Sequence, residues 1–273
     1  MAKIALWGRH GGLIDMMFDL LQHHEVRIQE PYLNYPLWQG NEELYVYTFA
    51  YDGLKTHPAD KPFIVYATDP AHSWQTYDFK NLQKRGTIVL AEDCYLHNEF
   101  FPIEKVDYTI PFAMNYDKYH AYTGEINKVL IVNRKVRPRW SEVVHGATGI
   151  NYTLEEFLGD IPFEICNIAN QNQYRDTLGR YKVMFYFSNS PYSIVMFEGL
   201  TIGMPMVGYN HFNVHTYSPV EKYLINYGTG MKEIREMLQK ELTMPAREVT
   251  YNNIRFNDAV KQWDDVINKT IGL

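Results

Sequence analysis

Several features that would assign the chain to a special class are scarce or missing. Only two cysteines occur, Cys94 and Cys166, and they stand far apart in the sequence. They form neither a disulfide framework nor a C-x-x-C metal motif. The opening residues MAKIALWG read as a strand and lack the charged start and apolar core of a secretion signal. We therefore expect a cytoplasmic protein, located in the bacterial host if the chain is viral.

Long apolar runs and an excess of positive charge are missing as well. No apolar stretch approaches the roughly 18 residues that a membrane-spanning helix needs, so we expect no integral membrane segment. Lys and Arg number 26 against 32 Asp and Glu, which gives a formal net charge of −6. That balance argues against a protein that coats nucleic acid or membrane by bulk electrostatics, although it allows a local basic patch.

The first part of the chain alternates strand and helix patterns. Residues 3–8, KIALWG, form an apolar strand, a GRHGG turn follows, and residues 13–24 carry apolar side chains at helical spacing. Further strands are predicted at 62–70, 87–93 and 106–112, and a helix that ends in glycine is predicted at 77–86. Strands that are separated by helices indicate a mostly parallel sheet.

The same pattern restarts after a polar, aperiodic stretch at residues 113–127. Strands are predicted at 128–134, 162–168, 181–188 and 204–209, and helices at 153–160 (with Thr153 as its cap), 173–180, 220–228, 230–242 and 255–271. We predict an α/β fold of two Rossmann-like domains that face one another across a cleft. The predicted parts are an N-terminal domain at 1–115, a linker at 116–127, a second domain at 128–252 and a C-terminal helix at 253–273 that returns toward the first domain.

One acidic residue stands out in the apolar stretch FSNSPYSIVMFEGLTIGMPMVGYN, residues 187–210. Ser190 or Ser193 can cap a helix here, and Gly203 followed by Pro205 ends it. A helix that starts after a parallel strand presents free N–H groups at the carboxyl edge of the sheet, which favours anions. Glu198 lies further along this helix. It either binds the ribose of a nucleotide or is a buried acid paired with an arginine or a backbone donor.

A run of basic residues follows the first strand of the second domain. The segment NRKVRPRW, residues 133–140, places Arg134, Lys135, Arg137 and Arg139 at the same carboxyl edge. Guanidinium groups pair well with phosphate oxygens. The run is either a diphosphate clamp together with the helix start at Ser193, or a solvated basic loop.

These two segments resemble the C-terminal domain of GT-B glycosyltransferases of the retaining kind, which use nucleotide-sugars. The family carries the pattern E-G-F-G-x-x-x-x-E-A-x-A-x-G-x-P-V-V, and SPYSIVMFEGLTIGMPMVG fits it with Glu198 on the second Glu. The family's strand that ends in Gly-Arg is similar to Asn133-Arg134, with Arg139 in place of its Lys. Ser190 replaces the first Glu and Ser193 replaces a glycine. The resemblance covers about residues 106–273 and is only architectural before them.

The resemblance implies a hexosyltransferase with the GT-B architecture that takes a sugar from a nucleoside diphosphate without a metal and with retention. It implies no permanently bound cofactor and a UDP-sugar, such as UDP-glucose, as the expected donor. The implied donor-binding residues are Arg134, Arg139, Lys135, Ser190, Ser193, Ile194 and Glu198, together with Gly11 and Gly12 of the first domain. In this reading the arginines and the amides at 193–195 neutralise the leaving diphosphate, and Glu198 holds the ribose.

Two strand ends of the first domain carry candidate catalytic groups. Asp69 and His72 follow one predicted strand, and Glu92 and Asp93 end another. Strand ends at a cleft are suitable places for a general acid or base, although caps and turns explain aspartates equally well.

The sequence leaves the acceptor, the oligomeric state and the stereochemical outcome open. A hydroxymethylated base in bacteriophage DNA is one acceptor that we consider, which would make the protein a DNA-modifying enzyme. A cell-surface polysaccharide, a lipid-linked sugar and a protein are the others. Two further classes stay open, a GT-B-fold sugar epimerase and a non-catalytic nucleotide-sugar-binding protein. Ser190 in the place of the motif glutamate favours the last.

Overall fold

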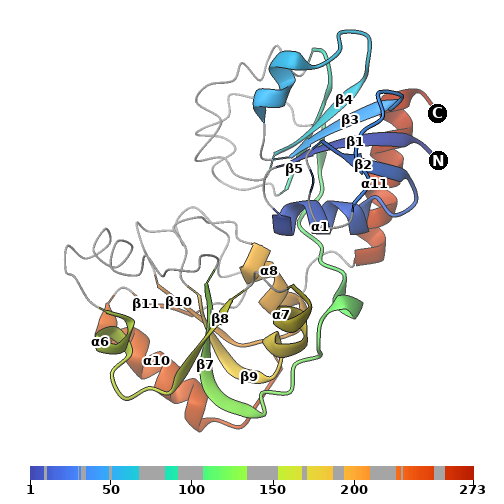
Figure 1. Cartoon of the computed structure of the whole chain (residues 1–273). Helices are drawn as coiled ribbons and strands as arrows, with labels where there is room; N and C mark the ends of the chain where they lie inside the picture. Colours follow the sequence, from blue (N-terminus) through green and yellow to red (C-terminus); the bar gives the residue numbers. More distant parts are fainter. Residues whose placement is uncertain are drawn as a thin grey trace. The chain divides into compact units, whose positions relative to one another are not determined.

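The chain divides into two compact units (Figure 1). One unit is formed by Met1–Asn115 together with Asn253–Leu273, and the other by Tyr116–Asn252. The structure, a computed structural model, describes residues 1–8, 11–29, 31, 35–48, 51–67, 84–91, 107–133, 153–167, 171–186, 194–209, 226–228, 230–248 and 256–273. Within this part of the chain, no helix is both long and apolar enough to cross a bilayer.

The first unit is built on a parallel sheet of six strands in the order β2-β1-β3-β4-β5-β6. The strands are β1 (Lys3–Gly8), β2 (Glu25–Ile28), β3 (Leu44–Thr48), β4 (Phe63–Ala67), β5 (Thr87–Leu90) and β6 (Tyr108–Thr109). Every residue of β3 and β4 is buried. Such continuously apolar strands are typical of a parallel sheet that is covered on both faces.

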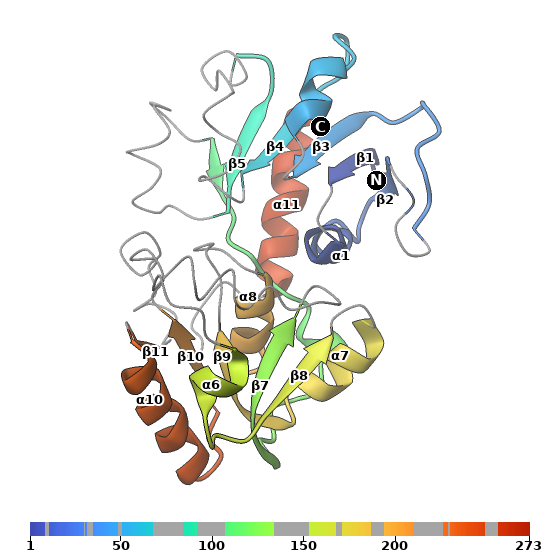
Figure 2. The ribbon, with the colours of Figure 1, turned by 60° about the vertical axis from the view of Figure 1, so that its left-hand side comes forward.

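Helices α1 (Gly11–Leu20) and α11 (Phe256–Ile271) contact each other on the first unit. The fully buried indole of Trp263 in α11 packs edge-on against the ring of Tyr66 in β4, with the ring centroids 5.0 Å apart. On the opposite face of the sheet, side chains of the strands form an apolar cluster that includes Tyr45 and Tyr47. Leu54 of the short helix η1 (Tyr51–Thr56) belongs to the same cluster. The C-terminal segment is thus an integral part of the first unit (Figure 2).

A carboxylate on α11 joins this helix to the end of α1. Asp264 accepts hydrogen bonds from two histidines, with 2.7 Å to Nδ1 of His23 and 3.0 Å to Nε2 of His24. Nδ1 of His24 accepts the backbone N–H of Ala2 at 3.2 Å. These partners require a proton on Nε2 and a lone pair on Nδ1, which is the neutral form of the His24 ring.

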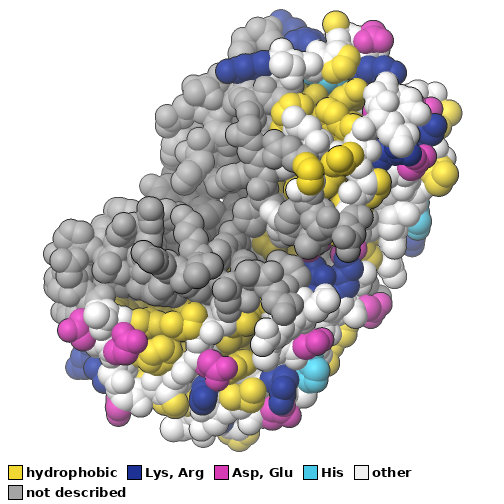
Figure 3. Space-filling model, viewed as in Figure 1, with side chains coloured by type: hydrophobic (Ala, Val, Ile, Leu, Met, Phe, Trp, Pro, Cys, Tyr) yellow, Lys and Arg dark blue, Asp and Glu magenta, His cyan; other side chains and the backbone are white. Residues whose placement is uncertain are grey.

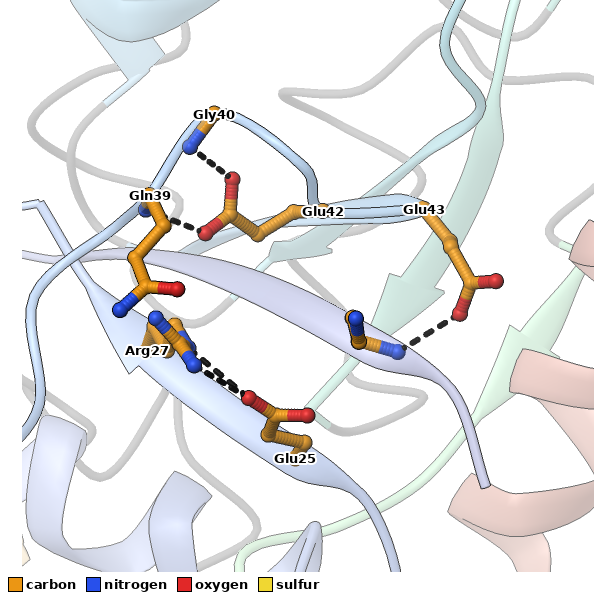
Figure 4. A network of polar contacts seen from close by, with 7 residues as sticks. Glu25, Arg27, Gln39, Gly40, Glu42 and Glu43 are labelled. Carbon is orange, nitrogen blue, oxygen red and sulfur yellow. Dashed lines mark hydrogen bonds and ion pairs between the residues drawn. The ribbon is translucent and has the colours of Figure 1, made fainter.

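A polar network fixes the chain between β2 and β3 (Figure 4). The buried carboxylate of Glu42 accepts the backbone N–H groups of Gln39 at 2.7 Å and Gly40 at 2.9 Å. Glu43 accepts the N–H of Lys3 at 2.9 Å, so the start of β3 is also tied to β1. Glu42 therefore has a structural role, because its oxygens satisfy the amides of a tight turn.

The second unit is built on a five-stranded parallel sheet in the order β11-β10-β9-β7-β8. Its strands are β7 (Ile126–Asn133), β8 (Phe163–Asn167), β9 (Tyr181–Tyr186), β10 (Met206–Tyr209) and β11 (Asn226–Gly228). Its helices are η3 (Tyr116–Lys118), α6 (Leu154–Leu158), α7 (Gln171–Leu178), α8 (Ile194–Thr201) and α10 (Met231–Thr243).

The two faces of this sheet are covered by different helices. Helices α6 and α10 bury their apolar sides against one face, where Val129, Val183 and Val207 point. Helix α8 lies on the other face, because its Gly199 is packed against the side chains of Met184 and Met206. These pairings place α8 directly beside β9 and β10 (Figure 2).

Most of the predicted elements in the described residues are present, but two predictions need correction and two strands were missed. The helix predicted at 220–228 is wrong for Asn226–Gly228, which form β11 beside β10. Residues 84–86 form a turn and are not the end of a helix, and the rest of that predicted helix lies outside the described residues. Strands β2 and β3 were not predicted, because their polar and aromatic residues give no apolar run as plain as that of β4. The predicted cap of α6 is confirmed, since Thr153 and Glu156 form a capping box.

The first unit should lose stability in mild acid. Burial lowers the pKa of His24 below its ordinary value of 6.5, and burial lowers the pKa of His57 in the same direction. Just below pH 6.5, the rings of His24 and His57 are therefore more protonated in the unfolded chain than in the folded protein. The stabilisation is complete above pH 6.5 and is lost as the pH falls through the folded-state values. We expect urea unfolding to give a lower free energy of unfolding at about pH 5 than at about pH 7. In His24→Gln this decrease should be smaller, and an equal decrease would contradict the assignment.

Candidate functional site

The order of the strands in the second unit locates its candidate ligand site. The first strand, β7, lies between the second, β8, and the third, β9, so the direction of winding reverses at β7. In open parallel sheets, ligands bind beyond the carboxyl ends of the strands at such a switch point. Strand β7 ends at Asn133 and β9 ends at Tyr186, and α8 begins at Ile194 on the chain that leaves β9.

Helix α8 is buried along most of its length. Its residues Ile194 to Leu200 are all buried. Gly199 allows the helix to lie close to the sheet, since a Cβ there would stand 3.0 Å from the sulfur of Met206. Gly203 follows the helix with φ +75°, a conformation that glycine adopts without strain. Helix α8 is therefore packed closely against the sheet and ends at a glycine suited to the turn.

Glu198 on α8 accepts hydrogen bonds from two tyrosines. The hydroxyl of Tyr119 donates to Oε1 at 2.9 Å, and the hydroxyl of Tyr174 on α7 donates to Oε2 at 2.7 Å. Glu198 is only 4% exposed, and Tyr119 and Tyr174 are 8% and 1% exposed. Two tyrosine hydroxyls are thus partners of the buried acid, and neither was predicted from the sequence.

The surroundings keep both hydroxyls protonated. Burial, reinforced by the Glu198 carboxylate, raises the pKa of Tyr119 and of Tyr174 well above the ordinary value of 10. The guanidinium of Arg175 lies over the ring of Tyr119, with its central carbon 5.6 Å from the centroid. A carboxylate offers about four acceptor positions. The two tyrosine hydroxyls occupy at least two of these positions on Glu198.

The chain that enters the second unit at Tyr116 packs against α7 and the turn after it. The N–H of His120 donates to the carbonyl of Arg175 at 3.0 Å, and the N–H of Thr123 donates to the carbonyl of Gly179 at 2.8 Å. A Cβ on Gly179 would lie 2.4 Å from the carbonyl oxygen of His120 and 2.8 Å from that of Ala121. Glycine is needed here because two backbone segments touch.

The first unit has a switch point of the same kind. Strand β1 lies between β2 and β3, and α1 starts at Gly11 shortly after β1 ends at Gly8. Gly11 and Gly12, predicted to approach the donor, are the first two residues of α1 and are partly exposed. One turn further on, the buried carboxylate of Asp15 accepts the hydroxyl of Tyr35 at 2.5 Å.

Of the predicted site residues, the structure describes four, namely Gly11, Gly12, Ile194 and Glu198. Nine others lie outside the described residues: Asp69, His72, Glu92, Asp93, Arg134, Lys135, Arg139, Ser190 and Ser193. The described residues contain no group of three or more His, Cys, Asp or Glu side chains that could hold a metal ion. Sequence reasoning missed Tyr119 and Tyr174, and the only available signal was the unexplained acid in an apolar helix.

Comparison with known proteins supports the fold. No family model matches the sequence, and no curated protein matches it. The solved structure of AviGT4, a glycosyltransferase involved in avilamycin A biosynthesis, is similar at 14% identity with a TM-score of 0.58, covering 100% of this chain and 99% of that one. HepE of Anabaena in complex with UDP-glucose is similar at 10% identity with a TM-score of 0.62, covering 98% and 100%.

A third similar structure belongs to a putative UDP-N-acetylglucosamine 2-epimerase of Listeria monocytogenes, at 10% identity with a TM-score of 0.61, covering 99% of this chain and 97% of that one. At such low identities the likeness concerns the fold. The chain has an α/β fold of two Rossmann-like domains like that of GT-B glycosyltransferases, which confirms the predicted fold class.

Replacing Glu198 should strongly destabilise the second unit. Glu198→Ala would leave the hydroxyls of Tyr119 and Tyr174 buried without an acceptor, which costs about 1–3 kcal/mol for each. We expect urea unfolding to show a loss of roughly 3 kcal/mol, and Glu198→Gln, which keeps one acceptor oxygen, to lose less. A change below about 0.5 kcal/mol in Glu198→Ala would contradict the hydrogen bonds described here.

Gly179→Ala should be equally costly for a steric reason. The new methyl group would meet the carbonyl oxygens of His120 and Ala121, and neither backbone segment can move without breaking the bonds to Arg175 and Gly179. We expect a loss of about 2–4 kcal/mol in the same unfolding experiment. Gly230→Ala is a matched control, because a Cβ at Gly230 would meet nothing within 4 Å.

Proposed function

We propose that the protein is a GT-B glycosyltransferase that moves a hexose from a UDP-sugar to the hydroxyl group of an acceptor. The observation that carries the proposal is the position of α8. This buried helix follows β9 at the switch point of the sheet, with Glu198 inside it. The full-length likeness in fold to a UDP-glucose complex supports a UDP-sugar as the donor.

The basic segment fits the same location. Arg134, Lys135 and Arg139 come directly after β7, the strand at which the winding reverses. Ser190 and Ser193 come between β9 and α8, on the chain that leads to the helix N-terminus. Free N–H groups and guanidinium groups are the donors that bind a diphosphate. A donor with an anionic leaving group is therefore the best match for this edge of the sheet.

The chemistry follows from charge. The bond between the anomeric carbon and the β-phosphate oxygen breaks, a bond from that carbon to the acceptor oxygen forms, and the UDP leaves with the additional negative charge. Arg134, Arg139 and the amides at 193–195 stabilise that charge. The acceptor proton passes to the leaving phosphate, which gives retention of configuration. Glu198 accepts hydrogen bonds from the ribose hydroxyls in this proposal.

The first unit supplies the acceptor side in this proposal. Asp69, His72, Glu92 and Asp93 are the candidate acid and base groups, and Gly11 and Gly12 at the start of α1 are candidate donor-binding residues. We propose no particular acceptor. None of the three similar structures described above is said to act on DNA. On the face of the second unit that Figure 3 shows, the acidic and basic side chains of the described residues are interspersed.

A sugar epimerase is the second candidate, and one observation favours it. The structure of the putative UDP-N-acetylglucosamine 2-epimerase from Listeria is about as similar as those of the glycosyltransferases. An epimerase changes the configuration of the sugar without an acceptor. Incubating the protein with UDP-glucose or UDP-N-acetylglucosamine and following the sugar by NMR separates the two candidates. An epimer indicates the epimerase, and UDP released only with an acceptor indicates the transferase.

The proposal is tested first by nucleotide binding. We expect UDP to raise the melting temperature more than GDP, ADP or TDP does, because a ligand at about 100 times its Kd stabilises a protein by roughly 2.7 kcal/mol. Arg134→Ala should weaken UDP binding about tenfold or more in calorimetry, since it removes charge-assisted bonds to phosphate.

Arg180→Ala is the matched control for Arg134→Ala. Arg180 precedes β9 at the opposite, amino end of the sheet, and it forms an exposed ion pair with Glu125. It should therefore change neither UDP binding nor stability appreciably. Equal effects of the two substitutions, or no response of the protein to any of the nucleotides, would contradict the proposed donor site.

A further inference from the structure

Gly199 of α8 faces the sheet, where two methionine side chains lie beneath the helix. We propose that Gly199 is a positioning residue of the donor site. Because this residue has no side chain, α8 can lie close to β9 and β10, and the spacing sets where the N-terminus of the helix stands. The part of this inference that concerns the donor rests on the proposed function, whereas the packing of α8 does not.

Two methionines of adjacent strands form the surface under Gly199. Met184 of β9 and Met206 of β10 are paired in register, and they are 0% and 3% exposed. A Cβ on Gly199 would lie 3.0 Å from the sulfur of Met206 and 3.2 Å from the terminal methyl carbon of Met184. Both distances are shorter than the roughly 3.5–4.0 Å at which nonbonded atoms attract most strongly. An added methyl group would therefore displace either α8 or the methionine side chains.

Glycine is otherwise an unfavourable residue at this position. In a helix it is less stable than alanine, because its backbone loses more conformational freedom on folding. Gly199 has no positive φ, so its backbone conformation is one that alanine adopts as readily. In the family pattern given above, the residue after the second Glu is indeed alanine. The need for glycine at 199 is therefore one of space and not of backbone conformation.

Other contacts leave α8 little freedom to retreat from the sheet. The neighbouring Glu198 is bound by the hydroxyls of Tyr119 and Tyr174, which tie the helix to α7 and to the entry segment. At the other end of the helix, the N–H of Met204 donates to the carbonyl of Gly199 at 2.9 Å. This bond joins the last turn of α8 to the chain that leads into β10. A lift at Gly199 would thus act against a fixed C-terminal end.

Such a lift would be larger at the start of the helix than at Gly199. At about 1.5 Å per residue, Gly199 lies about 3 Å from the end of α8 at Thr201 and about 7.5 Å from its start at Ile194. With its last turn tied, the helix tilts, and its start moves roughly three times as far as Gly199 does. A lift of a few tenths of an ångström then moves the N-terminus by about 1 Å, whereas binding groups need placement within about 0.5 Å.

The packing is tested with Gly199→Ala, Met206→Val and the double variant. Met206→Val removes the sulfur and the terminal methyl group and keeps a side chain that favours strands. We expect alanine at 199 to lower the urea midpoint when Met206 is present, because it overpacks the layer. In the Met206→Val background it should raise the midpoint, because the methyl group fills free space and alanine favours the helix. The same sign of change in both backgrounds would overturn the packing.

The donor part is tested by calorimetry with UDP on the same four proteins. We expect Gly199→Ala to raise the Kd of UDP about threefold to tenfold, because the amides at the start of α8 no longer align with the diphosphate. Met206→Val alone should bind UDP as the wild type does. The double variant should return to within about twofold of the wild-type Kd. A loss of binding that came only from lower stability would not be repaired by a second substitution in the core.

Gly159→Ala is the matched control for an effect of stability alone. Gly159 follows α6, which covers the opposite face of the same sheet, and its φ of +65° is unfavourable for alanine. This variant should lower the urea midpoint and leave the Kd of UDP unchanged.

The outcomes separate the two parts of the inference. Equal Kd values in the wild type and Gly199→Ala, or an equal increase in Gly159→Ala, would overturn the positioning role. Absence of UDP binding to the wild type would refute the proposed function and the donor part with it. The urea midpoints of the ligand-free proteins would still decide whether Gly199 sets the packing of α8.

Discussion

The structure of the second unit depends on keeping a carboxylate inside an apolar layer. Glu198 lies among buried residues of α8, and an acid without partners there would cost several kcal/mol. Two tyrosine hydroxyls remove that cost, and each comes from a different part of the chain. The requirement to satisfy one side chain therefore fixes α7, α8 and the entry segment relative to one another.

The other buried acids among the described residues also have hydrogen-bond or ion-pair partners. Asp15 accepts a tyrosine hydroxyl, Glu42 accepts two backbone amides, and Glu241 forms a two-pronged ion pair with Arg247. Glu42 and Glu241 stay within short stretches of chain, so their partners secure local turns and ends. Glu198 differs because its partners lie 79 and 24 residues away in sequence. Such long-range bonds connect distant parts of the second unit, whereas the bonds of Glu42 and Glu241 fix only local structure.

Local signals explain what could be predicted from the sequence. Strand β1 and the helices α10 and α11 were found because apolar spacing is a property of neighbouring residues. The cap of α6 was found for the same reason, since Thr153 and Glu156 stand three positions apart. The partners of Glu198 were not found, because nothing near Tyr119 or Tyr174 indicates which distant acid their hydroxyls will meet. The sequence predicted that a partner must exist, and only the fold could identify it.

The same reasoning bears on how a carboxylate can be both structural and functional. The motif resemblance assigns Glu198 to the ribose, and the hydrogen bonds assign it to two tyrosines. In the proposed site, a carboxylate that is held by buried tyrosines is already oriented before a ligand arrives. A flexible, solvated glutamate would have to be ordered on binding, at a cost in side-chain entropy. Burial between Tyr119 and Tyr174 removes that cost, so the contacts that stabilise the second unit are also those that would prepare it for a nucleotide.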